Sequence, residues 1–337
     1  MRMFGMSLVL SVAAIACLVA PCGSQGGTNS EATIRVDGFD RTYLVHRPAG
    51  FNSGKALPVV MMLHGRGSSS SSAANDFGWI EKSDKEGFLI VFPQALPIDP
   101  ARSPGSPLPA DFIHGWNVPT NDTLWWTHEM ATNYPHVANP NYPRAAHPLD
   151  APFLTAVLHN VLHRFNGDPQ QVYIAGFSSG GEMASDFAQF ASAKITSAAI
   201  VGSVGLSRPH QLTHPLSLFL AIGTDDSFGQ PSQTAWNAMP AIAREKWYGQ
   251  ESLPTLDQDA AAWSHLNGCK RSKTTWTLWG QQTDWSTCDK NVRIRELSVD
   301  HLGHEWPGSK PSRWNQANSK EPLYLTDVLW SFFCSGN

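Results

Sequence analysis

Charged residues are few in this sequence, and its basic residues form no run. Only 15% of the 337 residues are charged, with 24 Lys and Arg against 28 Asp and Glu, so the formal net charge is −4. Globular proteins usually carry about a quarter charged residues. Nucleic-acid binding requires clustered Lys and Arg that neutralise phosphates. The composition therefore argues against a nucleic-acid partner, and a hydrophobic content of 42% argues against a disordered chain.

Long hydrophobic runs are also scarce, and the clearest one lies at the N-terminus. One Arg precedes an apolar stretch of about 15 residues that ends in small residues, which is typical of a secretory signal. The stretch is short for a membrane span, and no basic stop-transfer cluster follows it. We therefore predict a signal peptide at residues 1–22, a flexible linker at residues 23–32, and a secreted or periplasmic location.

A lipid anchor is the alternative outcome of export. Residues 13–17 read AAIAC, which resembles a lipoprotein cleavage box with Cys17 as the lipid acceptor. Cys22 is a weaker candidate because Pro21 precedes it. The membrane is expected as a partner only through such an anchor.

Cysteine is rare, and three of the five cysteines lie beyond the predicted signal peptide: Cys269, Cys288 and Cys334. Exported chains meet oxidising conditions, so we expect a disulfide between Cys269 and Cys288. The bond would close a loop of about 20 residues, worth about 3 kcal/mol in the chain-entropy model. Pairing of Cys334 with either of them, or unpaired buried thiols, remain the alternatives.

Short strands alternate with helices along residues 33–337. Residues 33–47 alternate in polarity and predict two edge strands around a turn at Asp37-Gly38. Short, continuously apolar runs of the kind found in strands buried on both faces follow, at residues 58–65, 88–93, 171–176, 198–205, 216–223 and 292–299. Helical patterns separate them, at residues 74–86, 150–165, 181–193, 257–267 and 321–333. The order predicts an α/β fold, with a mostly parallel central sheet and helices on both faces.

Two segments interrupt this alternation. Residues 68–72 are five serines in succession, which we interpret as a mobile loop. Residues 95–149 are rich in Pro, Asn and Trp, and an insertion of that length is usually a lid or a binding rim; a decorative surface insertion is the alternative. Tryptophans are expected at the substrate rim; the candidates are Trp116, Trp125, Trp126 and, further along the chain, Trp306.

The strongest local signal is the pentapeptide Gly176-Phe177-Ser178-Ser179-Gly180. It follows the apolar strand QVYIAG and opens the helical pattern GEMASDFAQFA. A G-x-S-x-G at a strand–turn–helix junction is the nucleophile elbow, whose tight turn presents the Ser hydroxyl. The sequence therefore predicts Ser178 as a nucleophile.

A serine nucleophile needs a base, and the base needs an orienting acid. In this arrangement the acid and then the histidine follow the serine along the chain. Asp225 and Asp226 follow one apolar strand, and His301 and His304 follow another. Strand ends at the carboxyl edge of a parallel sheet are where such groups belong. His159 and His163 could face one side of a helix, but no third ligand is evident, so we predict no metal site.

Two backbone N–H groups are expected to bind the oxyanion that forms during acyl transfer. One is the N–H of Ser179, the residue after the nucleophile, and the other is the N–H of Arg66 in the loop after VVMMLHG. His64 would then shape that loop and transfer no proton.

Together these residues resemble the exported esterases of the polyhydroxybutyrate depolymerase type, relatives of bacterial feruloyl and acetylxylan esterases. The resemblance rests on RTYLVHRP, LPVVMMLHGRG, GFLIVFPQ, QQVYIAGFSSGGEMA, GTDD and LGHEWPG. It implies the α/β-hydrolase fold and a Ser–His–Asp triad. The family patterns G-T-x-D and G-H-x-W-P-G place the acid at Asp226 and the base at His304. The family's cysteine pair matches Cys269 and Cys288.

The sequence departs from the family in three places. Ile222 stands where a histidine usually precedes G-T-x-D, the acidic pair before the next helix is reduced to Leu149-Asp150, and the segment 118–148 is longer and richer in Trp. No separate polymer-binding domain is expected, which favours soluble or oligomeric esters over solid polyester.

The sequence thus predicts an exported serine carboxylic-ester hydrolase that forms an acyl-enzyme and needs no cofactor. Its substrate would be a small ester, an oligoester or an ester linked to polysaccharide. An acyltransferase or a peptidase on the same fold is the alternative, because the triad does not choose the acceptor. A non-catalytic polysaccharide-binding protein is a further alternative.

Overall fold

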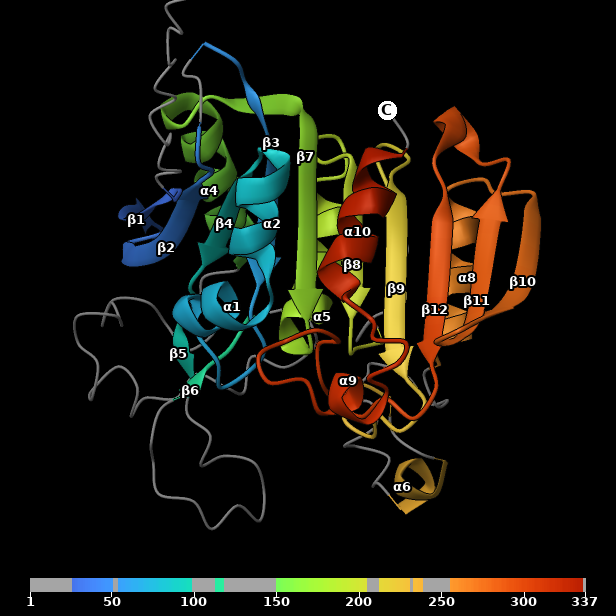
Figure 1. Cartoon of the computed structure of the whole chain (residues 1–337). Helices are drawn as coiled ribbons and strands as arrows, with labels where there is room; N and C mark the ends of the chain where they lie inside the picture. The colour runs from blue at the N-terminus through green and yellow to red at the C-terminus, as the bar shows by residue number, and fades with distance from the viewer. Residues whose placement is uncertain are drawn as a thin grey trace, which may run out of the picture.

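A ten-stranded sheet runs through the protein (Figure 1). The computed structural model describes residues 26–50, 54–98, 113–117, 150–204, 212–230, 233–238 and 255–335. The strand order is β1-β2-β4-β3-β7-β8-β9-β12-β11-β10. The strands are β1 (Thr28–Val36), β2 (Phe39–Arg47), β3 (Leu57–Leu63), β4 (Leu89–Pro93), β7 (Gly167–Phe177), β8 (Ser197–Val201), β9 (Ser217–Gly223), β10 (Arg271–Thr277), β11 (Gly280–Ser286) and β12 (Ile294–Val299).

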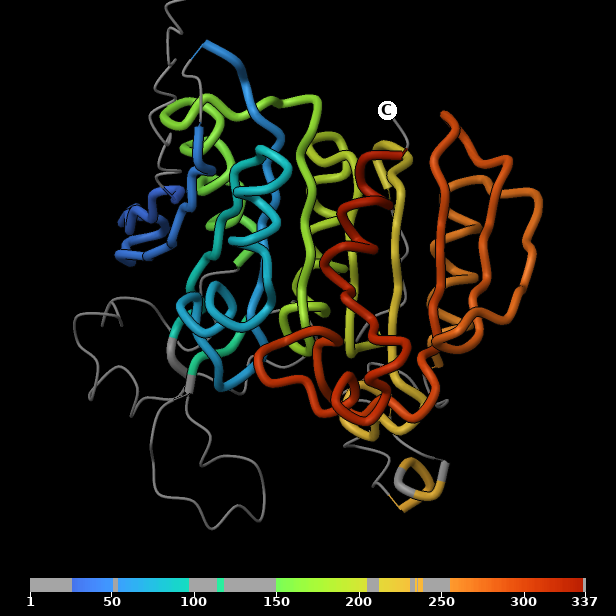
Figure 2. Tube along the Cα trace, in the orientation of Figure 1, coloured from blue at the N-terminus to red at the C-terminus, as the bar shows by residue number. Residues whose placement is uncertain are grey.

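The middle of the sheet is parallel and its two ends are antiparallel. β4, β3, β7, β8, β9 and β12 pair in parallel, whereas the β1–β2 and β10–β11 hairpins flank them in antiparallel pairing. The two hairpins lie at opposite ends of the sheet (Figure 2). The central strands are continuously apolar because both faces of the sheet are covered.

Helices pack on both faces and enclose two hydrophobic clusters. α4 (Asp150–Arg164), α5 (Ser179–Phe190) and α8 (Leu256–Leu266) cover one face, where Phe153, Phe187 and Trp263 are buried. α1 (Ser70–Asp76), α2 (Trp79–Glu86) and α10 (Leu325–Cys334) cover the other face, where Trp79 and Leu329 are buried (Figure 1). The predicted α/β fold, with a mostly parallel sheet and helices on both faces, is confirmed.

Short elements complete the described chain. α6 (Gln233–Ala238) and α9 (Arg313–Ala317) are short helices, and η3 (Asp289–Asn291) is a 3₁₀ turn. β5 (Pro97–Ile98) and β6 (Ile113–His114) form a two-stranded ladder. Of the predicted 95–149 insertion, the structure describes residues 95–98 and 113–117. The rest of the insertion and the predicted signal peptide lie outside the described residues.

Two local predictions are wrong. The predicted linker at residues 23–32 overlaps β1, because Thr28 already pairs with Arg47 in the β1–β2 ladder. The five-serine run is no loop, since its last three residues begin α1 and Ser69 is the N-cap, whose Oγ accepts a hydrogen bond from the N–H of Ser72 at 3.1 Å. Serine is a favoured N-cap because its side chain satisfies an N–H that the helix leaves unpaired.

The predicted helix at residues 74–86 divides into α1 and α2. Gly78, between them, has a φ of 73°, a left-handed conformation that favours glycine and ends the first helix. The β1–β2 turn at Asp37-Gly38 forms as predicted. None of the described helices is both long enough and apolar enough for a membrane span.

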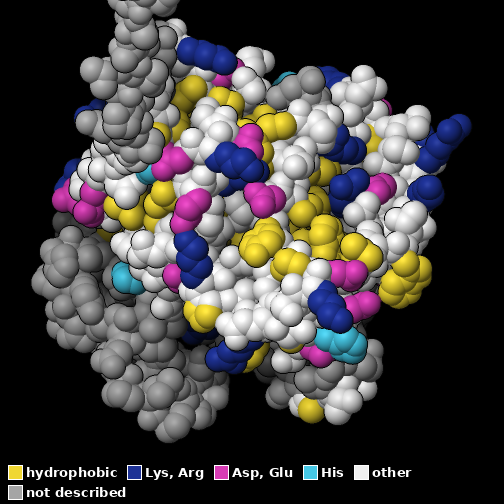
Figure 3. Space-filling model, viewed as in Figure 1, with side chains coloured by type: hydrophobic (Ala, Val, Ile, Leu, Met, Phe, Trp, Pro, Cys, Tyr) yellow, Lys and Arg dark blue, Asp and Glu magenta, His cyan; other side chains and the backbone are white. Residues whose placement is uncertain are grey.

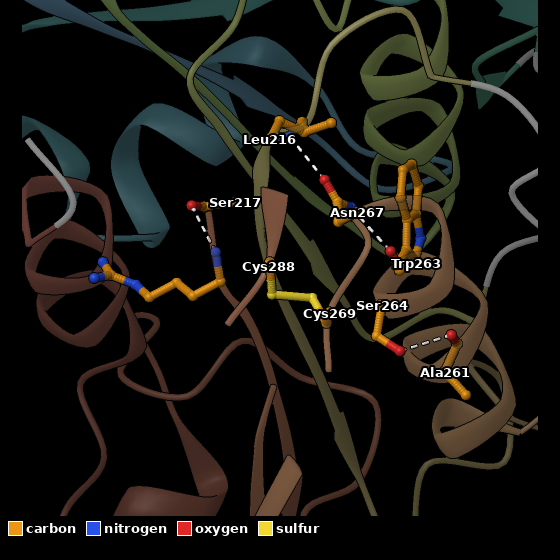
Figure 4. The surroundings of a disulfide bond; sticks show 9 residues. Leu216, Ser217, Ala261, Trp263, Ser264, Asn267, Cys269 and Cys288 are labelled. Carbon is orange, nitrogen blue, oxygen red and sulfur yellow. Dashed lines mark hydrogen bonds between the residues drawn. A yellow bond between two sulfur atoms is a disulfide. The ribbon is translucent and has the colours of Figure 1, made fainter. Parts of the chain in front are cut away.

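The disulfide joins Cys269 and Cys288, as predicted (Figure 4). It links the turn after α8 to the residue before η3, at the base of the β10–β11 hairpin. Beside it, Asn267 Oδ1 accepts a hydrogen bond from the N–H of Leu216, so the same corner is also tied to the start of β9. Cys334 is free and exposed at the end of α10.

The face that carries α2 and α10 shows acidic and basic side chains interspersed (Figure 3). Lys82 pairs with Glu86 at 3.0 Å and with Asp327 at 2.8 Å, and Lys310 pairs with Glu81. Lys82 and Lys310 are therefore neutralised by acidic neighbours on this face.

Candidate active site

Ser178 lies on a strained turn between β7 and α5. Its φ of 57° and ψ of −126° place a non-glycine residue in a rarely adopted region, as the nucleophile elbow requires. Glycine is needed on both sides. A Cβ on Gly176 would lie 1.9 Å from the carbonyl oxygen of Gly180, and a Cβ on Gly180 would lie 2.4 Å from that of Leu63. The turn therefore closes only with glycine at these two positions.

Three strand ends bring a serine, a histidine and an aspartate into one hydrogen-bonded chain. His304 follows β12, and its Nε2 lies 2.9 Å from Ser178 Oγ. Its Nδ1 lies 2.9 Å from both carboxylate oxygens of Asp226, which follows β9. These ends meet because the carboxyl ends of parallel strands share one edge of the sheet. The arrangement can accept the serine proton on Nε2 while the aspartate holds the Nδ1–H tautomer.

The aspartate is fixed by its own loop. Asp226 is 3% exposed, and its Oδ1 accepts hydrogen bonds from the N–H groups of Phe228 at 3.1 Å and Gly229 at 2.7 Å. The imidazole of His304 lies 4.8 Å from the ring of Phe177 and 5.4 Å from that of Phe228, centroid to centroid. The carboxylate and the imidazole are therefore both held in one orientation.

The alternative acid and base lie elsewhere. Asp225 and His301 are exposed, and Asp225 Oδ2 lies 3.7 Å from His301 Nδ1. They form a pair of their own outside the hydrogen-bonded chain. His159 and His163 are exposed on α4 with ring centroids 4.3 Å apart. Across the described residues, no group of three or more His, Cys, Asp or Glu side chains is placed to hold a metal ion.

The predicted oxyanion donors lie on either side of the elbow. Ser179 is the first residue of α5, where a backbone N–H has no acceptor within the helix. Arg66 lies in the loop after β3, whose neighbour Gly65 approaches Ser178 so closely that a Cβ on Gly65 would lie 3.4 Å from Ser178 Cβ. The N–H of Ser179 thus lies at the elbow, and the loop that carries Arg66 packs against it.

His64 shapes this loop. Its Nδ1 donates to the carbonyl of Gly65 at 2.8 Å, and its Nε2 accepts from the N–H of Ala95 at 3.2 Å and from Gln94 Nε2 at 3.3 Å. Burial lowers the pKa of His64 to about 4, with a smaller opposing effect from the Gly65 hydrogen bond. A neutral imidazole with one donor and one acceptor matches these partners.

Glu182 and Arg66 are ionisable groups close to the elbow. Glu182 lies in the first turn of α5, and its N–H donates to the carbonyl of Ser178 at 3.1 Å. Burial raises the pKa of Glu182 to about 8, and the guanidinium of Arg66 partly opposes this rise. Burial also lowers the pKa of Arg66.

Two of the predicted rim tryptophans lie in the core. Trp306 is 1% exposed, donates from Nε1 to Thr326 Oγ1 at 3.1 Å and stacks on Phe77. Trp116 is 8% exposed and donates from Nε1 to the carbonyl of His64 at 2.7 Å. The prediction of rim positions is therefore wrong for both.

Trp125 and Trp126 lie outside the described residues. The exposed aromatic beside the triad is Phe228, whose side chain is 79% exposed. The position of Phe228, two residues after Asp226, was the sequence signal that could have identified it.

One buried ion pair was not predicted from the sequence. Arg41 of β2 and Asp150 at the start of α4 have side-chain exposures of 1% and 0%, and Arg41 Nη2 lies 2.5 Å from Asp150 Oδ1. Asp150 Oδ2 accepts a hydrogen bond from the N–H of Asn117 at 2.6 Å. A charged residue at a core-facing position of a strand was the available signal.

No protein-family model matches the chain. A bifunctional acetylxylan esterase/xylanase of Neocallimastix patriciarum, XynS20E, is 21% identical over 270 residues, which cover 80% of this chain and 32% of that protein. The esterase-type protein NocK of Nocardia uniformis subsp. tsuyamanensis is 23% identical over 296 residues, 83% of this chain and 75% of NocK. The chain thus spans about a third of the first relative's length and three quarters of the second's.

Among solved structures, an S-formylglutathione hydrolase from Agrobacterium tumefaciens superposes with a TM-score of 0.53 at 14% identity. The alignment covers 93% of this chain and 96% of that one. This likeness shows the fold, and the two relatives confirm the predicted resemblance to esterases. The chain thus has the fold of this hydrolase and is similar in sequence to the two esterases.

Proposed function

We propose that this esterase-like α/β-hydrolase is an exported serine carboxylic-ester hydrolase with Ser178, His304 and Asp226 as its triad. The observation that carries the proposal is the hydrogen-bonded chain from Ser178 Oγ through the imidazole of His304 to the carboxylate of Asp226, with 2.9 Å at each link. The strained elbow at Ser178 supports it, because backbone strain of this kind clusters at active sites.

The chain's own residues supply each step of the reaction. Ser178 Oγ forms a bond to the ester carbonyl carbon while its proton passes to His304 Nε2. The N–H groups of Arg66 and Ser179 hold the oxyanion. The bond to the alcohol then breaks, and His304 returns the proton to the leaving oxygen. Water repeats the sequence on the acyl-enzyme, releasing the carboxylic acid and restoring Ser178.

The substrates we propose are soluble or oligomeric esters, either polyhydroxybutyrate-type oligoesters or acetyl and feruloyl esters of polysaccharide. The relative that is named as an acetylxylan esterase supports the second group. The exposed ring of Phe228 beside His304 offers an apolar contact for a substrate at the reaction centre.

A panel of esters tests the function: an acetyl ester, a butyryl ester, a 3-hydroxybutyryl oligomer and methyl ferulate. We expect the wild type to hydrolyse at least one, and Ser178→Ala and His304→Ala to lower kcat/KM about a thousandfold or more. His301→Ala is the matched control, because His301 is exposed and outside the triad, and should retain activity. Equal rates for wild type and Ser178→Ala would contradict the proposal. Faster transfer to an added alcohol than to water would favour an acyltransferase.

Export is tested separately. Expression of the full chain in a bacterial host, followed by N-terminal sequencing of the mature protein, should find it outside the cytoplasm and cleaved before about residue 23. A blocked, lipid-bearing N-terminal cysteine at Cys17 or Cys22 would identify the lipoprotein alternative, and an uncleaved cytoplasmic chain would contradict export.

A further inference from the structure

The loop that carries Arg66 is held at both ends by residues 114–117. At its start, the carbonyl of His64 accepts the Nε1–H of Trp116 at 2.7 Å. At its end, the N–H of Gly67 donates to the carbonyl of His114 at 2.8 Å. Arg66 lies between these two anchors, so the direction of its N–H follows the position of residues 114–117.

Residues 114–117 are in turn held by a charge. The N–H of Asn117, the residue after Trp116, donates to Asp150 Oδ2 at 2.6 Å, and Asp150 Oδ1 accepts from Arg41 Nη2 at 2.5 Å. Hydrogen bonds to an ionised acceptor are shorter and about twice as strong as neutral ones. The carboxylate of Asp150 therefore fixes Asn117, and through it Trp116, more firmly than an amide or a hydroxyl would.

The guanidinium of Arg41 also contacts a ring and a backbone carbonyl. It lies 3.9 Å from the ring centroid of Phe153, and its Nη2 also lies 3.4 Å from the carbonyl of Gln94. Its Nε and Nη1 are buried and have no hydrogen-bond partner among the described residues. A buried ion pair with unsatisfied donors is a poor source of stability, because apolar residues of similar volume usually serve as well or better. Stability of the fold therefore does not explain why Arg41 and Asp150 form a buried ion pair.

We propose that Arg41, Asp150 and Trp116 are positioning residues for the oxyanion donor of Arg66. This inference rests on the proposed esterase function. The route runs from Arg41 to Asp150, then to Asn117 and Trp116, and from there to the carbonyl of His64, two residues before Arg66. None of the three side chains is assigned a contact with the substrate. They act through the backbone of the 64–67 loop.

The sharpest test is Trp116→Phe, which keeps an aromatic ring and removes the N–H that donates to the carbonyl of His64. Loss of a whole oxyanion donor lowers kcat about a hundredfold to a thousandfold. Displacement of the donor should lower kcat about tenfold to a hundredfold, with KM within about twofold, because the developing oxyanion is stabilised mainly in the transition state. The affinity for an arylboronic acid, whose tetrahedral adduct places an oxygen in the same hole, should fall by a similar factor.

The matched control is Trp263→Phe. Trp263 is fully buried in α8, and its Nε1 has no hydrogen-bond partner in the described part of the chain, so this variant loses the same volume without losing a hydrogen bond. It should lower the melting temperature as Trp116→Phe does while keeping kcat and boronate affinity. A purely structural role for Trp116 would make the two variants alike.

The outcomes separate the two proposals. A wild type that hydrolyses esters, with kcat and boronate affinity of Trp116→Phe within twofold of it, would overturn the positioning role and leave the esterase function standing. A wild type that neither hydrolyses esters nor binds the boronate would overturn the esterase function and the positioning role with it. Parallel losses of kcat and boronate affinity, absent from Trp263→Phe, would support the inference.

Discussion

Replacing Arg41 and Asp150 one at a time and then together should separate the stability of the fold from the geometry of the active site. Among the described residues, Asp150→Leu leaves the guanidinium of Arg41, at 1% exposure, with the 3.4 Å contact to the carbonyl of Gln94 and the ring of Phe153. Within the same described part of the chain, Arg41→Met leaves the buried carboxylate of Asp150 with the N–H of Asn117 as its partner. Breaking a buried pair from one side costs about 3–5 kcal/mol.

The double variant, Arg41→Met with Asp150→Leu, removes both charges and fills the space with apolar side chains. Its remaining cost is the hydrogen bond between the half-buried N–H of Asn117 and the carboxylate, at about 1.5–3 kcal/mol for a bond to a charged group. Apolar contact with Phe153 offsets part of that cost. The double variant should therefore be more stable than either single variant, with a coupling energy of at least about 2 kcal/mol.

Urea unfolding of the oxidised protein, followed by tryptophan fluorescence, gives the free energies of unfolding for this cycle. Changes in unfolding free energy, each relative to wild type, that add up from the two single variants to the double variant would refute the reasoning, because the pair would then have no coupling. Ester hydrolysis on the same samples adds a second result. The double variant should recover stability without recovering kcat, since Asn117 still lacks its carboxylate.

Two further predictions concern pH and oxidation. Burial raises the pKa of Glu296 from 4.5 to about 9, helped by the hydrogen bond that protonated Glu296 donates to Asp257 and by the negative charge of Asp257, so its contribution to stability is full below about pH 4.5 and is lost as the pH rises towards 9. Between about pH 5 and 9, the melting temperature of Glu296→Gln should therefore rise relative to that of the wild type as the pH increases. A difference in melting temperature that stays constant with pH would contradict the raised pKa. Removing the disulfide with Cys269→Ser and Cys288→Ser should cost about 3 kcal/mol of unfolding free energy and leave kcat unchanged, with Cys334→Ser as the neutral control. A lower kcat at unchanged stability would contradict that assignment.

The order of elements could be predicted because the central strands carry their own signal. Strands such as LPVVMML and SLFLAIG are buried on both faces and so read as unbroken apolar runs. β10 and β11 gave no such signal, because RSKTTWT and GQQTDWS are mostly polar and β10 is largely exposed. They become strands because β11 pairs with β12 and β10 pairs with β11, and not through an apolar pattern of their own.

The positions of the candidate triad followed from the strand ends and the spacing of their motifs. The residues that support the site could not be found in that way. Arg41 and Asp150 are 109 residues apart, and their pairing depends on packing of β2 near α4 rather than on any local pattern. Trp116 was interpreted as a rim residue because tryptophans in a polar insertion suggest a binding surface, whereas its N–H is used inside the core.

The sheet has an unpaired edge at β10, which in the described chain pairs with β11 alone. An open edge of this kind can recruit a strand from another molecule and so begin aggregation. Here the edge strand carries Arg271 and Lys273, both exposed, and like charges on a second copy would repel them. The same hairpin leaves Trp276 and Leu278 about three-quarters exposed, at 73% and 74%. Arg271 and Lys273 therefore oppose edge-to-edge pairing of two molecules. A variant that neutralised both would let the exposed Trp276 and Leu278 promote self-association.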